Sequence, residues 1–478
     1  MEHHFIILRA REVVLALLTI STAVVFAQPV IEIPFHVAKG YNQGWSALHA
    51  ARVARHLPLY WDRASLVTND YPPLYFYLLW LFGSMFGDYI IVGRVLSLLG
   101  LVIVATNIII VSRLSGASGI AAAFGALLFL GLCGTYSPVY IGMNDPQWLA
   151  LALTTTGLVV VLTGSEKDGP IIAACALMYV AGLIKHNVIP LPLAVAIWLW
   201  FQSRRQFYLW VGFSLLLLLA SAWILYVCFG PDVFVSIFQS PRVYSFSDAA
   251  EKNYERFLPL LTLISASAVY LVFAHANRHA QLIGIYIGIA ALWSAAVSGG
   301  NGIDINHTFD LVIGLSIAAS MIVHEGTKIF VSIKKFSLLQ AALMFALALP
   351  VLTSTPRKLT QLKIGLPESF AATAQTAEAV KFLKNHPNRA ACETLALCYW
   401  ADKDFEVDFF NTGQKVRKGA IKDTVLLDLI QGRKFAVIQL NDKSGSGRLP
   451  QEINKSILDH YEIKKTLTRV GVLLTPRS

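Results

Sequence analysis

The chain is dominated by long apolar runs separated by short polar breaks. A run of about 20 apolar residues spans the hydrocarbon core of a bilayer, and prolines and polar turns between such runs are typical of membrane helices joined by loops. The pattern predicts roughly eleven spans. They lie near residues 13–28, 92–112, 118–138, 147–163, 170–187, 189–203, 208–229, 257–274, 281–298, 309–323 and 337–353.

After about residue 353 the pattern changes to that of a soluble protein. Phe370–Asn385 has the spacing of an amphipathic helix. Val425–Ile430, Phe435–Leu440 and Val470–Leu474 are short β-prone runs between polar turns. The sequence therefore predicts a polytopic α-helical membrane protein, with a bundle over residues 1–353 and a small C-terminal α/β soluble domain over residues 354–478.

The composition supports the membrane class. Hydrophobic residues make up 55% of the chain and charged residues only 14%, whereas a soluble protein carries about 25% charged residues. The net charge of +10 is compatible with contact with anionic lipids or an anionic substrate. No basic run with interleaved aromatic residues is present, which disfavours nucleic acid as a partner.

The distribution of basic residues predicts the topology. The N-terminus and the short loops on its side of the bundle are mostly positive, so we expect them to be cytoplasmic. Val13–Ala27 resembles the apolar core of a signal peptide, but the many later spans favour a retained helix. An odd number of spans places the C-terminal domain in the periplasm or outside the cell, and the bacterial inner (plasma) membrane is the expected location. A disulfide between Cys392 and Cys398 is compatible with that compartment.

The first outer loop, residues 29–91, is unusually long and contains two notable segments. Residues 45–56 are helix-like, and Tyr71–Phe86 is an aromatic run after Pro72 and Pro73. The aromatic run fits a helix lying in the membrane interface, where Tyr and Trp are favoured. A hairpin dipping into the bilayer is the alternative.

Four polar clusters fall at the outer ends of the spans, where ionisable groups are costly enough to suggest function. Asp70 precedes Tyr71, Pro72 and Pro73, and it either lies at a cavity mouth or simply begins a helix. Asp145 precedes Pro146, which is equally a helix-start signal. Lys185, His186 and Asn187 lie between two spans and form an anion site or a group that contacts lipid phosphate.

The fourth cluster is the turn 299–310, which contains Asp304, Asn306 and Asp310. It is either a polar turn between helices or a site for a sugar or a divalent cation. The spacing lacks the twelve-residue pattern of an EF-hand, so the metal ligands stay unassigned. The phosphate-cradling and HExxH motifs are absent, which disfavours an ATP-driven pump.

Three segments together resemble a known superfamily. They are residues 69–75 (Asn-Asp-Tyr-Pro-Pro-Leu-Tyr), residues 93–97 (Gly-Arg-Val-Leu-Ser) and residues 181–185 (Ala-Gly-Leu-Ile-Lys). With the long first outer loop and the outer C-terminal domain, this layout is similar to that of the GT-C membrane glycosyltransferases, especially the aminoarabinose and protein-O-mannosyl transferase branch. Members use a sugar carried on a polyprenyl phosphate and act at the outer face of the membrane.

The resemblance implies roles for individual residues. Lys185 would bind the donor phosphate, assisted by His186, Arg242 or Arg94. A carboxylate, Asp70 or Asp145, would deprotonate the acceptor hydroxyl, and cations would hold the departing phosphate. The sugar and acceptor pocket would be shaped by a further set of residues: Asn42, Gln43, Tyr71, Asp304, Asn306 and Asp310.

One position departs from the pattern of that branch. An acidic residue is usual early in the first outer loop, and Asn42 and Gln43 stand there instead. Asp70, Glu32 or Asp62 could substitute, the alignment could slip, or the protein could be inactive. The sequence thus predicts an inverting glycosyltransferase acting on a lipid or envelope glycan acceptor. The alternatives are a transporter or flippase of a lipid-linked sugar and an inactive scaffold.

Overall fold

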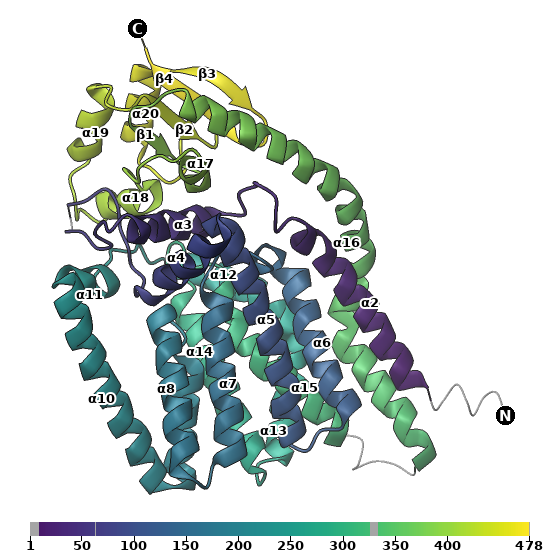
Figure 1. The fold of residues 1–478 in the computed structure, drawn as a ribbon. Coiled ribbons are helices and arrows are strands. Elements are labelled where there is room, and N and C mark those ends of the chain that lie inside the picture. Colours follow the sequence, from purple (N-terminus) through teal and green to yellow (C-terminus); the bar gives the residue numbers. More distant parts are fainter. Residues whose placement is uncertain (1–8, 63, 326–332, 478) are drawn as a thin grey trace.

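The computed structural model describes residues 9–62, 64–325 and 333–477. Its helices form a tall bundle, and a small domain with the four strands β1–β4 caps one end of it (Figure 1). The bundle helices are α2 (Ala10–Ile31), α5 (Tyr89–Leu114), α6 (Gly119–Tyr136), α7 (Gln147–Gly164), α8 (Asp168–Ile184), α9 (Pro190–Gln202), α10 (Arg204–Phe229), α13 (Leu261–Phe273), α14 (Arg278–Val297), α15 (Phe309–Glu325) and the first part of α16 (Ile333–Lys384).

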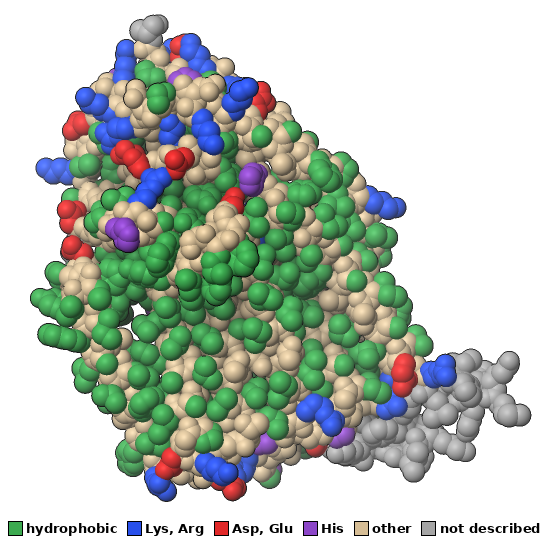
Figure 2. Space-filling model, viewed as in Figure 1, with side chains coloured by type: hydrophobic (Ala, Val, Ile, Leu, Met, Phe, Trp, Pro, Cys, Tyr) green, Lys and Arg blue, Asp and Glu red, His purple; other side chains and the backbone are tan. Residues whose placement is uncertain are grey.

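The helices are apolar enough to cross a membrane. Within the described ranges, nine helical segments have the required length and hydropathy, and α8 and α9 are shorter apolar helices. Together they coincide with the runs predicted from the sequence. Figure 2 shows a broad band of hydrophobic side chains over the bundle, with charged side chains gathered at its two ends. The chain is therefore an integral membrane protein.

Two short helices of the first outer loop lie between the bundle and the capping domain (Figure 1). They are α3 (Tyr41–Ala54) and α4 (Leu74–Phe86). Pro73 directly precedes α4, where its fixed backbone angle suits a helix start. Because α4 is one continuous helix, the alternative of a hairpin at this point is wrong.

Three further short helices connect the bundle helices at the same end or lead into them. They are α11 (Asp232–Phe238), α12 (Phe246–Phe257) and the 3-10 helix η3 (Ile305–Thr308). The 3-10 helices η1 (Pro138–Tyr140) and η2 (Leu258–Leu260) complete these connections. Of the polar clusters predicted from the sequence, the turn 299–310 contains η3 and Asp145 follows η1, whereas Asp70 precedes α4 and Lys185 lies between α8 and α9.

The capping domain is a small α/β unit. Its sheet has the order β1-β2-β4-β3, with β1 parallel to β2 and the other pairs antiparallel. The strands are β1 (Ala390–Cys392), β2 (Val437–Leu440), β3 (Tyr461–Leu467) and β4 (Gly471–Pro476), and the helices are α17 (Leu395–Trp400), α18 (Phe409–Arg417), α19 (Thr424–Gln431) and α20 (Gln451–His460).

One predicted strand of this domain is wrong. Val425–Ile430 lies within α19, which packs against α20. Its apolar residues Leu426 and Ile430 are four apart and both buried, as on one face of a helix. Five or six apolar residues cannot distinguish a helix from a strand by periodicity alone.

The bundle and the capping domain share one helix. α16 has 52 residues and so extends about 78 Å at 1.5 Å per residue. The predicted boundary at residue 353 falls inside it, and the predicted helix 370–385 is its last part. Beyond residue 353 it still contacts α2: the Ser369 hydroxyl donates to the Glu32 carboxylate, and Gly365 leaves room for Gln28.

The disulfide predicted from the sequence is present in the structure, between Cys392 and Cys398. Cys392 ends β1 and Cys398 lies in α17. The bond therefore ties the first strand of the sheet to the helix that packs on α3. Of the other cysteines, Cys133 and Cys175 are buried and Cys228 is exposed on α10.

Candidate active site

A cavity of about 720 Å³ lies where the bundle, the first outer loop and the capping domain meet. Its walls come from segments far apart in the sequence. The predicted site residues that line it are Asn42, Asp70, Tyr71, Lys185, His186, Arg242, Asp304 and Asn306. The structure thus brings three of the four predicted clusters to one space, and Asp145 of the remaining cluster lies directly behind the wall.

The cluster behind the wall is that of Asp145, which forms a buried ion pair with Lys185. Nζ of Lys185 lies 2.9 Å from Oδ1 of Asp145, and the two side chains are 2% and 1% exposed. Asn42 donates to the other carboxylate oxygen at 2.7 Å, and the backbone N–H of Gln147 donates to Oδ1 at 2.8 Å. Asp145 is therefore fully engaged, and it holds Lys185 at the cavity wall.

Tyr71 forms the adjacent part of the wall. The Nζ of Lys185 lies over its ring, 5.1 Å from the centroid, within the range of a cation–π contact. Burial raises the pKa of the Tyr71 hydroxyl to about 12, so the side chain stays neutral. His186 packs edge-on against the same ring, and burial lowers its pKa, which favours a neutral imidazole.

Asp70 is a carboxylate that faces the cavity. It forms an ion pair with Arg242, and the two side chains are 17% and 30% exposed. Arg242 also donates to Asn411 of the capping domain and lies over the ring of Phe410. Asp70 therefore stands at the junction of all three parts of the protein and remains accessible from the cavity.

The turn 299–310 contributes a further part of the wall. Asp304 accepts a hydrogen bond from the Tyr140 hydroxyl at 3.1 Å and another from the backbone of Ile305. Asn306 donates to Gln147 at 3.3 Å. Asp310 does not reach the cavity: it is buried in α15 and accepts a hydrogen bond from Tyr286 at 2.8 Å, because it lies one helical turn further into the bundle.

Arg94 and Gln43, two other expected site residues, also lie outside the lining of the cavity. Arg94 is fully buried and donates to the carbonyls of Glu32, Ile33, Phe35 and Val37. Its Nε donates to Gln43 at 2.7 Å. Arg94 thus fixes the first part of the outer loop away from the cavity, and Gln43 orients Arg94.

The remaining acids of the first outer loop are engaged as well. Glu32 forms an ion pair with Lys39 at 3.1 Å, and Asp62 accepts hydrogen bonds from the backbone of Ala64 and Ser65. Burial lowers the pKa of Lys39 to about 8, although Glu32 opposes the shift. No group of three His, Cys, Asp or Glu side chains suited to a metal ion occurs in the part of the chain that the structure describes.

Comparison with solved structures identifies the fold. ArnT from Cupriavidus metallidurans, bound to undecaprenyl phosphate, matches with a TM-score of 0.58 and 14% identity, over 96% of this chain and 97% of that chain. The same protein in the apo state matches with a TM-score of 0.60 and 13% identity, with the same coverage. The chain has the fold of ArnT. The predicted polytopic helical membrane fold with a small C-terminal α/β domain is therefore confirmed.

Other comparisons add little to the ArnT-like assignment. An oligosaccharyltransferase from Archaeoglobus fulgidus, in complex with Zn and sulfate, matches with a TM-score of 0.45 and 12% identity, over 82% of this chain and 61% of that chain. No protein-family model matches the sequence, and no curated protein matches it significantly. At these identities the similarity to ArnT establishes the fold alone.

Within this ArnT-like fold, sequence reasoning missed the contribution of the capping domain. Its residues that line the cavity are Phe410, Asn411, Gln414, Arg417, Gly447 and Arg448. Arg448 directly follows the Gly/Ser turn 444–447, and a cation at the end of such a turn was the available signal. Asn411 is held by Asp408, which also accepts from Tyr41. Burial raises the pKa of Asp408.

Proposed function

We propose that this protein is a glycosyltransferase that moves a sugar from a polyprenyl-phosphate carrier to a hydroxyl of a lipid or glycan acceptor. The observation that carries the proposal is the pairing, in one cavity beside the membrane bundle, of a fixed cation, Lys185, with an accessible carboxylate, Asp70. ArnT, which has the same fold, binds undecaprenyl phosphate. The extracytoplasmic face of the bacterial inner membrane is the expected place of the reaction.

Lys185 and Arg242 are suited to hold the carrier phosphate. Lys185 is fixed by Asp145, which Asn42 holds in turn, so its charge reaches the cavity without the cost of ordering a free lysine. Arg242 offers the planar fork that matches phosphate oxygens. Both would stabilise the negative charge that develops on the phosphate as it leaves.

Asp70 is the proposed general base. The acceptor hydroxyl attacks the anomeric carbon from the face opposite to the phosphate. A bond forms between acceptor oxygen and anomeric carbon, the bond from that carbon to the phosphate oxygen breaks, and the proton passes to Asp70. The anomeric configuration is inverted. Asp145 is a positioning residue in this scheme, because both of its oxygens are already engaged.

Carrier binding is the first test. Native mass spectrometry of the detergent-solubilised protein with added undecaprenyl phosphate should show a lipid adduct that Arg242→Gln weakens. Arg205→Gln, which removes an exposed arginine at the other end of the bundle, should leave the adduct unchanged. Equal binding by both variants, or no binding by the wild type, would contradict the carrier site.

Transfer is the second test, and it separates an enzyme from a transporter or an inactive scaffold. The wild type, mixed with a panel of undecaprenyl-phosphate sugars, should release undecaprenyl phosphate, and Asp70→Asn should slow the release by about 10²-fold or more while still binding the carrier. A wild type that binds the carrier and releases nothing from any donor would favour a non-catalytic protein. The absence of an acid at Asn42 and Gln43 is the feature that makes this outcome worth testing.

A further inference from the structure

The cations that line the cavity fall into two groups. In the bundle and the outer loop, Lys185, Lys39 and Arg242 each have a carboxylate partner. In the capping domain, no carboxylate of the described residues lies within 4 Å of Arg417, and Arg448 has one only at 3.8 Å from its Nε. The excess positive charge of the cavity therefore lies on the wall formed by the capping domain, which is the roof of the cavity.

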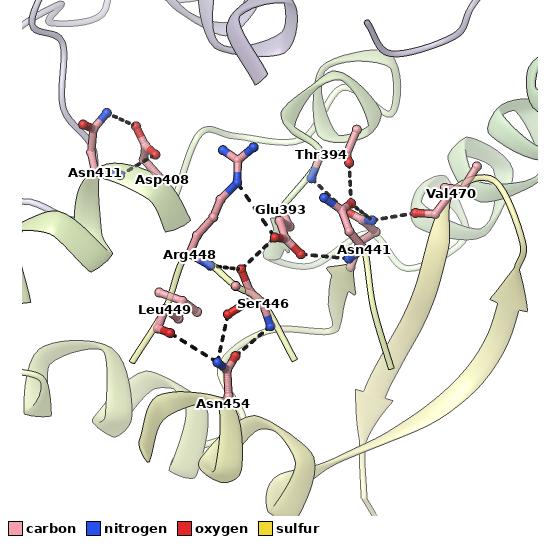
Figure 3. A network of polar contacts seen from close by, with 12 residues as sticks. Glu393, Thr394, Asp408, Asn411, Asn441, Ser446, Arg448, Leu449, Asn454 and Val470 are labelled. Atoms are coloured by element: carbon pink, nitrogen blue, oxygen red, sulfur yellow. Dashed lines mark hydrogen bonds and ion pairs between the residues drawn. The ribbon is translucent and has the colours of Figure 1, made fainter. Parts of the chain in front are cut away.

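Arg448 is held in place by a network that leaves its terminal nitrogens available. Glu393, opposite its Nε, accepts from Ser446 at 2.8 Å and from the backbone of Asn441 at 2.8 Å. Asn454 in turn donates to the carbonyl of Ser446 at 2.9 Å. Figure 3 shows the guanidinium of Arg448 extending past Glu393 and away from Asn454.

Aromatic rings complete the support of Arg448. Its guanidinium carbon lies 4.7 Å from the ring centroid of Tyr41 and 5.8 Å from that of Phe410. Stacking on rings orients a guanidinium without using its N–H donors. The donors of Arg448 therefore remain free to bind a ligand.

Arg417 lies beside Arg448 because α18 packs directly on the loop that carries it. Gly413 of α18 has no side chain, and a Cβ there would lie 2.0 Å from the carbonyl oxygen of Arg448. Arg417 follows one turn later, and its Nη2 is 3.5 Å from the carbonyl of Gly447. Two arginines whose positive charges have little compensation from carboxylates thus line the same wall of the cavity.

Arg448 also connects the main cavity to a second one. A space of about 330 Å³ lies between the outer loop and the capping domain, and it shares Gly40, Tyr41 and Arg448 with the main cavity. Its other polar walls include Thr394, Asn441 and Thr468. A ligand longer than one sugar therefore has room to extend past Arg448.

We propose that Arg448 and Arg417 form a second anion subsite, which binds an acidic group of the substrate on the side of the cavity away from the bundle. The inference rests on the proposed function and narrows its substrate class to molecules with a second phosphate or a carboxylate. The group is either the second phosphate of a carrier diphosphate or an acid on the transferred or accepting glycan. Arginine binds both through paired hydrogen bonds.

Two pairs of probes test the subsite and separate its sources. The full-length protein in detergent is titrated with undecaprenyl phosphate and undecaprenyl diphosphate, and separately with cellobiose and cellobiuronic acid. We expect the wild type to prefer the more acidic member of at least one pair by about tenfold or more, as one charge-assisted contact allows. The pair that shows the preference identifies the source of the acid.

The variants decide the assignment. Arg448→Gln and Arg417→Gln should abolish the preference while retaining the binding of undecaprenyl phosphate, and Lys443→Gln, which removes an exposed cation from the same loop as Arg448, should preserve it. A wild type without a preference in either pair, or a preference that survives both arginine variants, overturns the subsite. If the wild type fails to bind undecaprenyl phosphate, the proposed function fails first and the subsite with it.

Discussion

Lys185 and Asp145 form a buried ion pair at 2.9 Å at the wall of the polar cavity. Removing one partner of such a pair leaves a buried charge without compensation, which costs about 3–5 kcal/mol. We therefore expect Asp145→Asn to lower the midpoint of thermal unfolding strongly. The double variant Asp145→Asn, Lys185→Gln should recover most of the loss, since neither charge remains.

Carrier binding distinguishes the pair's two roles. The double variant lacks the cation that we assign to the phosphate, so it should be folded but bind undecaprenyl phosphate poorly. Thermal unfolding and native mass spectrometry on the same preparation measure both properties. A double variant that is stable and binds the lipid as the wild type does would show that Lys185 serves the fold alone.

Gly93 is required by a close contact between α5 and the turn before α7. A Cβ at this position would lie 1.9 Å from Oδ1 of Asn144, which accepts from the buried Tyr75 hydroxyl at 2.6 Å. Gly93→Ala should therefore destabilise the protein by about 1–3 kcal/mol. Gly182→Ala in α8 is the matched control, because the added Cβ would meet no atom of another element within 4 Å. Equal unfolding temperatures for the two variants would contradict the contact.

Arg94 should control the order of the first outer loop. It donates to four carbonyls between residues 32 and 37, which no lysine or glutamine could bind together. In Arg94→Gln we expect faster amide hydrogen exchange across residues 33–40 and little change in β1–β4. Unchanged exchange in that segment would mean that other contacts hold the loop.

Acid should destabilise the protein through His49. Burial lowers the pKa of this histidine to about 3, and its ring stacks on Phe76 at 4.9 Å. The unfolded state takes up a proton near pH 6.5 while the native state does not, so the free energy of unfolding falls as the pH drops from 6.5 toward 3. His49→Phe should flatten this dependence in thermal unfolding measured between pH 7 and pH 4. His275→Gln, at an exposed histidine, should keep it.

The disulfide between Cys392 and Cys398 can be tested directly by mass spectrometry of the alkylated protein. Alkylation of the denatured protein without reductant should label three cysteines, Cys133, Cys175 and Cys228, and reduction should add two further labels. Five labels before reduction would show that Cys392 and Cys398 are free thiols.

The spans, and the polar clusters of the bundle and the outer loop that line the cavity, were predictable because they depend on local sequence. Apolar runs of about 20 residues identify membrane helices directly, and costly polar residues at their ends, such as Lys185 and Asp70, indicate a site. The sequence could not show whether a charged side chain points into the cavity or into the protein. Arg94 and Asp310 carry charge near the same end of the bundle, yet their side chains point into the protein, where carbonyls and Tyr286 satisfy them.

The capping domain's share of the site was beyond local reasoning for a different reason. Arg448 and Tyr41 are about 400 residues apart, and only the docking of α18 and its neighbouring loop over the outer loop brings them together. The error at 425–430 has the same origin: the burial of Leu426 and Ile430 against α20 selects the helix, and α20 follows later in the chain.

The single helix α16 also has a mechanical consequence. It joins the bundle to the roof of the cavity without a break, and Ser369 ties it to the end of α2. A hinged lid needs a flexible connection, whereas the bundle and the capping domain are joined here by one continuous helix. Its prolines, Pro350, Pro356 and Pro367, are the points where a helix bends most easily. Any lifting of the roof to admit a bulky substrate must therefore bend α16 at one of them or tilt α2 in the membrane.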